Sequence, residues 1–170
     1  ATILVVDDTP ENLRLLLGLF RETGYSVATA ISGQMALESV HQVEPDLILL
    51  DVKMPGMDGY EVCRQLKANP AVADIPVLLI IALGHQEERL AGFAAGGADY
   101  INKPFFPEEV LARVETHLNL HQSLKQLQQQ KEELEREKAE REKSEQELAK
   151  YQERMAGILT RQLLRPKAFK

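Results

Sequence analysis

Cysteine, long apolar runs and a targeting segment are what this sequence lacks. Cys63 is the only cysteine among the 170 residues, which excludes an internal disulfide and fits a reducing compartment. No apolar stretch approaches the ~20 residues that a membrane-spanning helix needs, and no signal peptide is visible. We therefore expect a cytoplasmic protein without a membrane partner.

Basic residues are scarce in the first 120 positions. This part carries 8 Lys and Arg against 17 Asp and Glu, a net charge of −9, whereas residues 121–170 carry 12 against 9, a net charge of +3. An acidic surface repels nucleic-acid phosphates, so we expect no direct nucleic-acid contact. The tail interleaves both signs and is therefore not a polybasic arm. The break near residue 120 predicts a change of architecture.

Within residues 1–120, short apolar stretches alternate five times with amphipathic ones. This alternation predicts a parallel sheet with helices on both faces. Right-handed crossovers and one switch in strand order make it a doubly wound, flavodoxin-like α/β fold with strand order 2-1-3-4-5. Strands are expected at residues 3–6, 26–29, 47–50, 77–81 and 100–101, and helices at 10–22, 34–41, 60–67, 86–95 and from 107 onward.

Acidic residues directly follow two of these strands. Asp7 and Asp8 follow the first strand, and Asp51 follows the third. Ligands of doubly wound sheets bind at the carboxyl ends of the strands, so we expect the three carboxylates to converge. Converging carboxylates repel one another, and a hard cation such as Mg²⁺ relieves that repulsion. The plainer interpretation, solvated acids that cap strand ends, fits one acid better than three.

Lys103 follows the fifth strand and would bring an ammonium group to the same edge. It can pair with Asp51 or with a phosphoryl oxygen. A carboxylate beside a cation and a lysine is suited to attack phosphorus and to form an acyl phosphate. The metal and the lysine would offset charge on the equatorial oxygens. The residues therefore indicate phosphoryl-transfer chemistry.

Four motifs in a specific order and spacing strengthen this interpretation. They lie at Val5–Asp8, Leu49–Gly59, Pro76–Val77 and Gly96–Phe105. With these motifs the sequence resembles the receiver domains of two-component response regulators over roughly residues 1–120. The Asp pair alone would be a weak indication, but the combination is highly specific.

The resemblance implies a role for each matching residue. Asp51 corresponds to the phospho-acceptor and Lys103 to the lysine that contacts the phosphoryl group. Asp8 corresponds to a direct Mg²⁺ ligand, and Asp7 would hold the metal mainly through water. The backbone carbonyl of Lys53 would complete the protein ligands.

One position departs from the family pattern, which has Ser or Thr at the end of the fourth strand. Here that residue is Ile81. In the family the hydroxyl bonds the phosphoryl group, and its inward shift makes room for an aromatic residue of the fifth strand, here Tyr100. Isoleucine has no donor and is bulkier, so we predict that phosphorylation couples poorly to Tyr100. Tyr100 could also be only a half-buried strand aromatic.

The tail has no glycine or proline from residue 108 to 164 except Gly157, which predicts one long helix. A lone helix with so polar a middle needs a partner. Leucines recur in one heptad core position, at 120, 127, 134 and 148, whereas the other core position is largely polar. This pattern predicts a weak parallel coiled coil that is strained near residues 138–145. A solvated single helix or a disordered linker is the alternative.

We expect a receiver domain at residues 1–120, a coiled-coil signalling helix at 121–164, and at 165–170 the start of a linker to an output domain absent from this sequence. The predicted function is a phosphorylation switch. A sensor histidine kinase or phosphotransfer protein donates to Asp51 with Mg²⁺ as cofactor. The signal then passes through a homodimer formed by the helix, together with the receiver. The domain would catalyse only its own phosphorylation and dephosphorylation.

Two alternatives belong to other functional classes. The first is a constitutive dimerisation module whose switching is impaired because Ile81 replaces the usual hydroxyl. The second is a haloacid-dehalogenase-like phosphohydrolase, an enzyme class that needs a second Asp two residues after the nucleophile. Lys53 occupies that position, which disfavours the enzyme.

Overall fold

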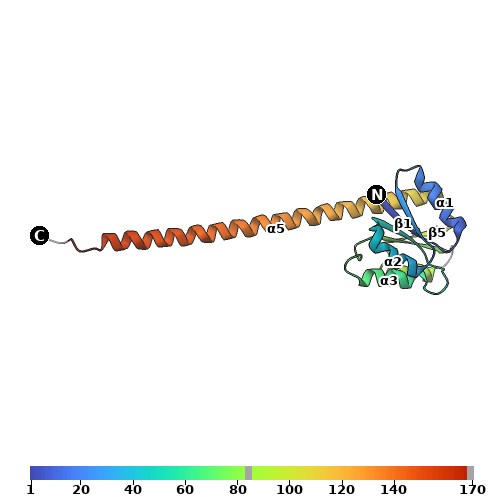
Figure 1. Ribbon diagram of the computed structural model, residues 1–170, viewed down its shortest axis with the longest axis horizontal. Helices are drawn as coiled ribbons and strands as arrows, with labels where there is room; N and C mark the ends of the chain where they lie inside the picture. The colour runs from blue at the N-terminus through green and yellow to red at the C-terminus, as the bar shows by residue number, and fades with distance from the viewer. Residues whose placement is uncertain (83–85, 168–170) are drawn as a thin grey trace. The chain divides into compact units, whose positions relative to one another are not determined.

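The computed structural model describes residues 1–82 and 86–167. Over this range, five parallel strands pair in the order β2-β1-β3-β4-β5, which confirms the predicted doubly wound fold (Figure 1). The order switches between β1 and β3, so the carboxyl ends of these two strands are neighbours. The strands are β1 (Thr2–Val6), β2 (Ser26–Ala30), β3 (Leu47–Asp51), β4 (Val77–Ala82) and β5 (Asp99–Lys103).

Helices follow the strands, and two of them begin with side-chain caps. Ser32 Oγ accepts a hydrogen bond from the Met35 N–H at 3.1 Å, and Asp58 Oδ1 accepts one from the Glu61 N–H at 2.9 Å. Each cap satisfies an N–H group that the helix itself leaves unpaired. The helices of the described residues are α1 (Pro10–Arg21), α2 (Gly33–Val43), α3 (Gly59–Ala68), α4 (Gln86–Ala94) and α5 (Pro107–Leu163).

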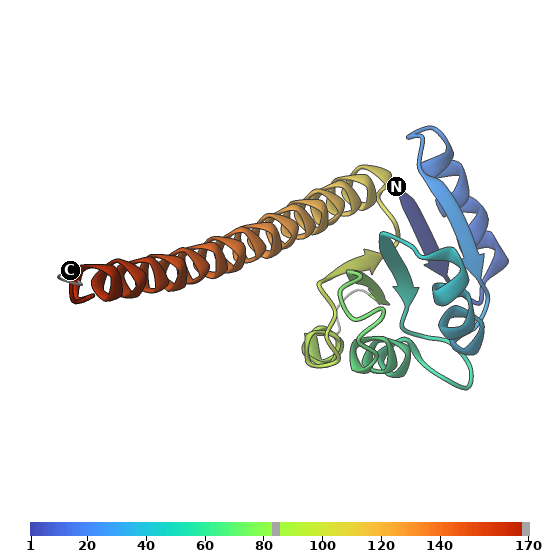
Figure 2. The same ribbon diagram turned by 60° about the vertical axis from the view of Figure 1, so that its left-hand side comes forward.

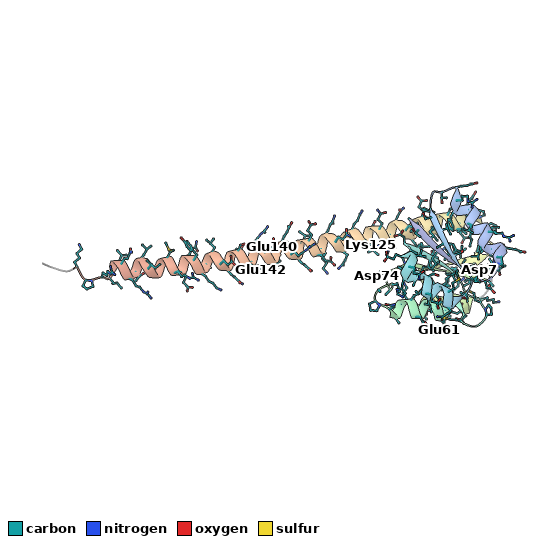
Figure 3. The ribbon with its side chains drawn as sticks, viewed as in Figure 1. Asp7, Glu61, Asp74, Lys125, Glu140 and Glu142 are labelled. Carbon is teal, nitrogen blue, oxygen red and sulfur yellow. The ribbon has the colours of Figure 1, made fainter. Side chains whose placement is uncertain are left out.

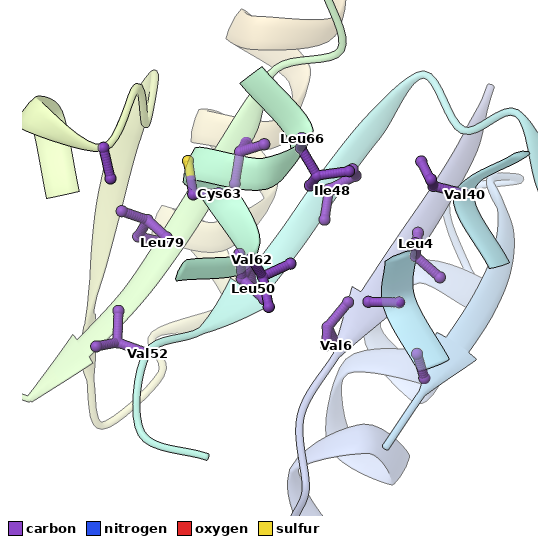
Figure 4. Close-up of a cluster of buried hydrophobic side chains, with 14 of the residues drawn as sticks. Leu4, Val6, Val40, Ile48, Leu50, Val52, Val62, Cys63, Leu66 and Leu79 are labelled. Carbon is purple, nitrogen blue, oxygen red and sulfur yellow. The ribbon is translucent and has the colours of Figure 1, made fainter. Parts of the chain in front are cut away.

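The sheet separates two hydrophobic cores, because successive side chains of a strand point to opposite faces. One core packs Leu16 and Phe20 of α1 and Val114 of α5 against the sheet. The other packs Val40 of α2 and Val62 of α3 against the opposite face (Figure 4). Figure 2 shows α1 on one side of the sheet and α2 and α3 on the other. Burying one such side chain stabilises the fold by ~1.5–3 kcal/mol.

The central strand β3 positions the site. All five of its residues are buried, as expected of a strand covered on both faces. Its first four residues are apolar, and its last residue, Asp51, is an acid that is only 2% exposed. The buried strand therefore delivers one carboxylate to the edge of the sheet, where the chain turns toward α3.

α5 changes character along its length. Its early residues Val110, Val114 and Leu118 are buried in the receiver core. The chain divides after Ser123 into two compact units, and beyond that point the described residues contain no buried side chain. Leu134 is 65% exposed there. Figure 3 shows side chains all along this helix.

The long C-terminal helix is confirmed, and it ends at Leu163. The coiled coil stays a prediction, since it requires a second chain. Within the described residues, none of the helices has the length and apolar character that crossing a bilayer requires.

Candidate functional site

Three carboxylates converge at the carboxyl ends of β1 and β3. Ligand oxygens of Asp7, Asp8 and Asp51 all lie within 4.8 Å of one another. Asp7 and Asp51 are buried, whereas Asp8 is exposed. Among the described residues, this is the one group of at least three His, Cys, Asp or Glu side chains close enough to hold a metal ion.

Asp7 is held in place by two local hydrogen bonds. Its Oδ1 accepts from the backbone N–H of Thr9 at 2.9 Å, and its Oδ2 accepts from the Asn12 side-chain amide at 3.1 Å. Both oxygens are therefore partly occupied by protein donors. Asn12 lies in the first turn of α1, and no feature of the sequence pattern marks it as a partner of Asp7.

Lys103 reaches Asp51 from the end of β5. Its Nζ lies 3.2 Å from both Oδ1 and Oδ2 of Asp51, so one ammonium group bridges the two oxygens of the carboxylate. The residues are 52 positions apart in sequence. The structure thus brings together the four predicted side chains, those of residues 7, 8, 51 and 103. The Lys103–Pro104 peptide bond is cis.

The surroundings of Asp51 disfavour its charge. Burial raises the pKa of this carboxyl most, the negative charge of Asp7 raises it further, and Lys103 and the Lys53 N–H only partly offset both effects. The resulting pKa is about 6, well above the ordinary value of 3.8. Excess negative charge at a partly buried site is a condition that a bound cation relieves.

The connection from β3 to α3 passes close beside Asp51. The backbone N–H of Lys53 donates to Asp51 Oδ1 at 3.3 Å, which places the residue-53 peptide next to the carboxylate. Gly59 packs so tightly against this segment that a Cβ atom would lie 2.8 Å from Val52 Cα. Glycine is therefore required at residue 59 by close backbone approach.

Ile81 fills the position where the family has a hydroxyl. Its side chain is 2% exposed and belongs to the core beneath α2 and α3. Tyr100 is half-buried against the same core. The Arg89 guanidinium carbon lies 4.7 Å from the centre of the Tyr100 ring, and the Phe93 ring meets it edge-on at 5.9 Å. Two side chains of α4 thus contact the tyrosine ring.

A second charged cluster, which the sequence did not reveal, joins β5 to α5. Asp99 accepts from Arg113 Nη1 at 2.7 Å and lies 3.0 Å from His117 Nε2. Burial alone would raise the pKa of Asp99, but hydrogen bonds from His117, the Tyr100 N–H and Arg113 outweigh it and hold the pKa below the ordinary value. The sequence signal that could have indicated this cluster is the spacing of Arg113 and His117, four residues apart on one helix face, together with the acid Asp99 in the preceding strand.

The donor set suits Mg²⁺. Carboxylate oxygens are the ligands this ion prefers, and burial together with the charge of Asp7 raises the pKa of Asp51 despite the nearby Lys103. The residues present therefore fit the ion that the sequence predicts.

A doubly wound sheet with three carboxylates and one lysine at its carboxyl edge defines a class of α/β domain that handles phosphoryl groups. The family model of the response regulator receiver domain matches residues 3–115. This is more than half of the chain, and the chain therefore belongs to that family, which confirms the resemblance seen in the sequence.

Curated relatives include the response regulator PleD of Caulobacter vibrioides. It is 42% identical over 131 residues, which cover 77% of this chain and 29% of PleD. The transcriptional regulatory protein BaeR of Escherichia coli O6:H1 is 40% identical over 131 residues, which cover 77% of this chain and 53% of BaeR. The chain thus spans about half or less of the length of these relatives.

Solved structures agree with this assignment. A putative response regulator from Chloroflexus aurantiacus is 38% identical with a TM-score of 0.68, and the match covers 69% of this chain and 97% of that one. NtrX from Brucella abortus is 27% identical with a TM-score of 0.70, and the match covers 75% of this chain and 28% of NtrX.

Proposed function

We propose that Asp51 accepts a phosphoryl group from the phosphohistidine of a sensor histidine kinase or a phosphotransfer protein. Phosphoryl acceptance is the general function of the receiver family to which the chain belongs. The observation that supports Asp51 as the acceptor is its contact with Lys103 inside a cluster of three carboxylates. A nucleophile, a cation site and a counter-charge for the transferred group are then all within reach.

The chain's own residues take part in both the phosphorylation and the dephosphorylation of Asp51. A carboxylate oxygen of Asp51 attacks phosphorus, the P–N bond to the donor imidazole breaks, and the departing imidazole takes up a proton. Lys103, already 3.2 Å from the carboxylate, offsets the charge of the transferred group. In dephosphorylation, water attacks phosphorus, the P–O bond to Asp51 breaks, and inorganic phosphate leaves. No separate metabolite is turned over.

Asp8, Asp51 and the backbone carbonyl of Lys53 are proposed as direct ligands of Mg²⁺. Asp8 is exposed and its carboxylate accepts no hydrogen bond from the described residues, whereas both oxygens of Asp7 already accept protein hydrogen bonds. We therefore assign Asp7 to a water-mediated contact. When bound, the ion stabilises negative charge on the phosphoryl oxygens.

Labelling with acetyl phosphate in the presence of Mg²⁺, read by intact mass, tests this function. The wild-type chain should gain one phosphoryl group, and Asp51→Asn should gain none. Asp58→Asn is the matched control, because Asp58 is an exposed acid that caps α3 and asparagine caps equally well. Equal labelling of the Asp51 variant and the wild type would exclude Asp51 as the acceptor.

The C-terminal helix is proposed to form a parallel homodimer that relays the change, with a contribution from the receiver, to an output domain outside this sequence. Its heptad leucines Leu127, Leu134 and Leu148 are 56–65% exposed, so each gains from burial against a second copy. Sedimentation of the whole chain tests the dimer. A monomer at every accessible concentration would overturn this part of the proposal.

A constitutive dimerisation module is the second candidate, and Ile81 favours it. The buried, hydroxyl-free side chain of Ile81 offers the phosphoryl group no hydrogen bond. Beryllofluoride with Mg²⁺ mimics the phosphoryl group, so NMR of the Tyr100 ring in wild type and Ile81→Thr distinguishes the two functions. The module predicts a Tyr100 response only in Ile81→Thr. Equal Tyr100 responses in the wild type and in Ile81→Thr would contradict the hypothesis that Ile81 impairs the coupling between the phosphoryl site and Tyr100.

A further inference from the structure

Two buried polar atoms have no hydrogen-bond partner in the described part of the chain. One is a donor, Nε of Arg89 on α4, and the other is an acceptor, Oδ1 of Asn102 on β5. A buried polar group without a partner costs ~1–3 kcal/mol. The two atoms are chemically complementary, so one hydrogen bond between them would remove both penalties.

Both residues lie on the face of the sheet that carries Tyr100. The Arg89 guanidinium stacks on Tyr100 at 4.7 Å. Asn102 follows Tyr100 by two residues on β5 and therefore projects from the same face of the sheet. The guanidinium carbon of Arg113 lies 5.6 Å from the centre of the Tyr100 ring, but Arg113 already forms ion pairs with Asp99 and Glu109. Arg89 is thus the guanidinium with unused donor capacity beside Tyr100.

Asn102 is also placed to sense the phosphoryl site. It immediately precedes Lys103, whose Nζ contacts Asp51. In the sheet it is the register partner of Ile81, the residue that lacks the family hydroxyl. Movement of Lys103 toward a phosphoryl group on Asp51 would therefore pull on the backbone that carries Asn102.

Two large apolar side chains of α4 contribute little to its packing. Its large apolar side chains Leu90 and Phe93 are 71% and 51% exposed, so little burial opposes a shift of the helix. Gly92 lets the helix lie close to β4, since a Cβ there would lie 2.7 Å from Leu79 Cδ1. Because Arg89 Nε and Asn102 Oδ1 are shielded from solvent, an internal rearrangement is the available way to pair them.

We propose that Arg89 and Asn102 form a switch pair whose hydrogen bond closes when Asp51 carries a phosphoryl group. The pair rests on the proposed function of Asp51. Closing it draws α4 along β5 and shifts Tyr100, and so supplies a polar coupling in a chain whose residue 81 has no hydroxyl. The surface that changes is then the exposed α4 face with Leu90 and Phe93.

Beryllofluoride affinity in the presence of Mg²⁺ tests the pair through a double-mutant cycle. Wild type, Arg89→Met, Asn102→Leu and the double variant are compared in the whole chain. Each single change should weaken binding about three- to tenfold, the worth of one hydrogen bond. The double variant should be no weaker than either single one, because both remove the same interaction. Arg64→Met is the matched control, since Arg64 is an exposed arginine of α3.

NMR of the Arg89 Nε–H resonance supplies a direct readout. It should shift downfield when beryllofluoride binds to the wild type, and this shift should be absent in Asn102→Leu. Independent, multiplicative losses in the cycle, or a shift that persists in Asn102→Leu, overturn the pair while the Asp51 function stands. A wild-type chain that binds no beryllofluoride overturns both, so the two failures are distinguishable.

Discussion

The receiver part and the C-terminal helical part of this chain use apolar residues in opposite ways. In the receiver, Leu16, Leu49 and Leu79 are at most 1% exposed, whereas Leu127 and Leu134 of the helix are 61% and 65% exposed. The receiver is stabilised by burial within itself. Beyond Ser123 the described part of the helix buries no side chain, so backbone hydrogen bonds, helix propensity and local bonds such as that from Gln128 to Glu132 stabilise it. The same residue type is therefore buried in one region and exposed in the other, where the proposed dimer would cover it.

Charged residues, like leucines, are buried at some positions of the receiver and exposed along the helix. The receiver buries Asp7 and Asp51, so their charges depend on specific donors. The helix keeps charges such as Glu140 and Glu142 exposed (Figure 3), where ion pairs contribute only a few tenths of a kcal/mol. Substitutions of charged residues should consequently change stability more in the receiver than in the helix.

Leucine-to-alanine changes in the two regions should give the largest contrast. Leu50→Ala removes a fully buried side chain and should lower the free energy of unfolding of the receiver by ~2–5 kcal/mol. Leu134→Ala should change it by less than ~0.5 kcal/mol, because that side chain is 65% exposed. Urea unfolding of the whole chain measures both. Similar losses for the two variants would show that the receiver is not stabilised independently of the helix.

Asp99→Asn should have the next largest effect. The change weakens the hydrogen bonds with Arg113 and His117 and should cost ~1–2 kcal/mol at neutral pH. Because folding lowers the pKa of Asp99, its stabilisation is complete above the ordinary value of 3.8 and is lost as pH falls through the lower folded value. Urea unfolding from pH 7 downward checks this. A difference between variant and wild type that already vanishes by pH 6 would contradict it.

Asp51→Asn should stabilise the receiver rather than weaken it. Folding raises the pKa of Asp51 from 3.8 to about 6, so its contribution to stability is present below pH 3.8 and is lost as pH rises through 6. Without Mg²⁺, the variant should be ~1–2 kcal/mol more stable at pH 7.5 and should lose that advantage toward pH 4. Thermal unfolding at both pH values measures this. Asp58→Asn, an exposed cap, should show no such pH-dependent gain.

Arg141→Leu should strengthen the helix without affecting the receiver. Residue 141 lies in the same heptad position as Leu134 and Leu148, so a parallel dimer would place two arginines face to face. Leucine should tighten self-association by about tenfold, a change of ~1.4 kcal/mol. Sedimentation equilibrium measures the affinity. Lys143→Leu, two residues away on the outward face, is the control, and equal tightening by both variants would argue against this register.

Much of the fold follows from local patterns. The apolar runs at β1, β3 and β4 and the turn residues between them predicted the element order, and the strand order followed from general rules of α/β folds. Boundaries were less accurate: the last strand extends from Asp99 to Lys103 rather than over two residues. Pairing with β4 over five positions extends it, and this is a tertiary effect.

The sequence by itself determined which residues carry the candidate chemistry, since Asp7, Asp8, Asp51 and Lys103 each stand directly at a strand end. Only the tertiary structure decided how they are tuned: the ammonium of Lys103 midway between two oxygens, the pKa of Asp51 raised to about 6, and the partnership of Asp99 with His117. The apolar runs that precede these residues are a local feature of the sequence, which periodicity reveals, although pairing with neighbouring strands sets the exact strand bounds. Distances, burial and partners arise between residues tens of positions apart, and no local pattern encodes them.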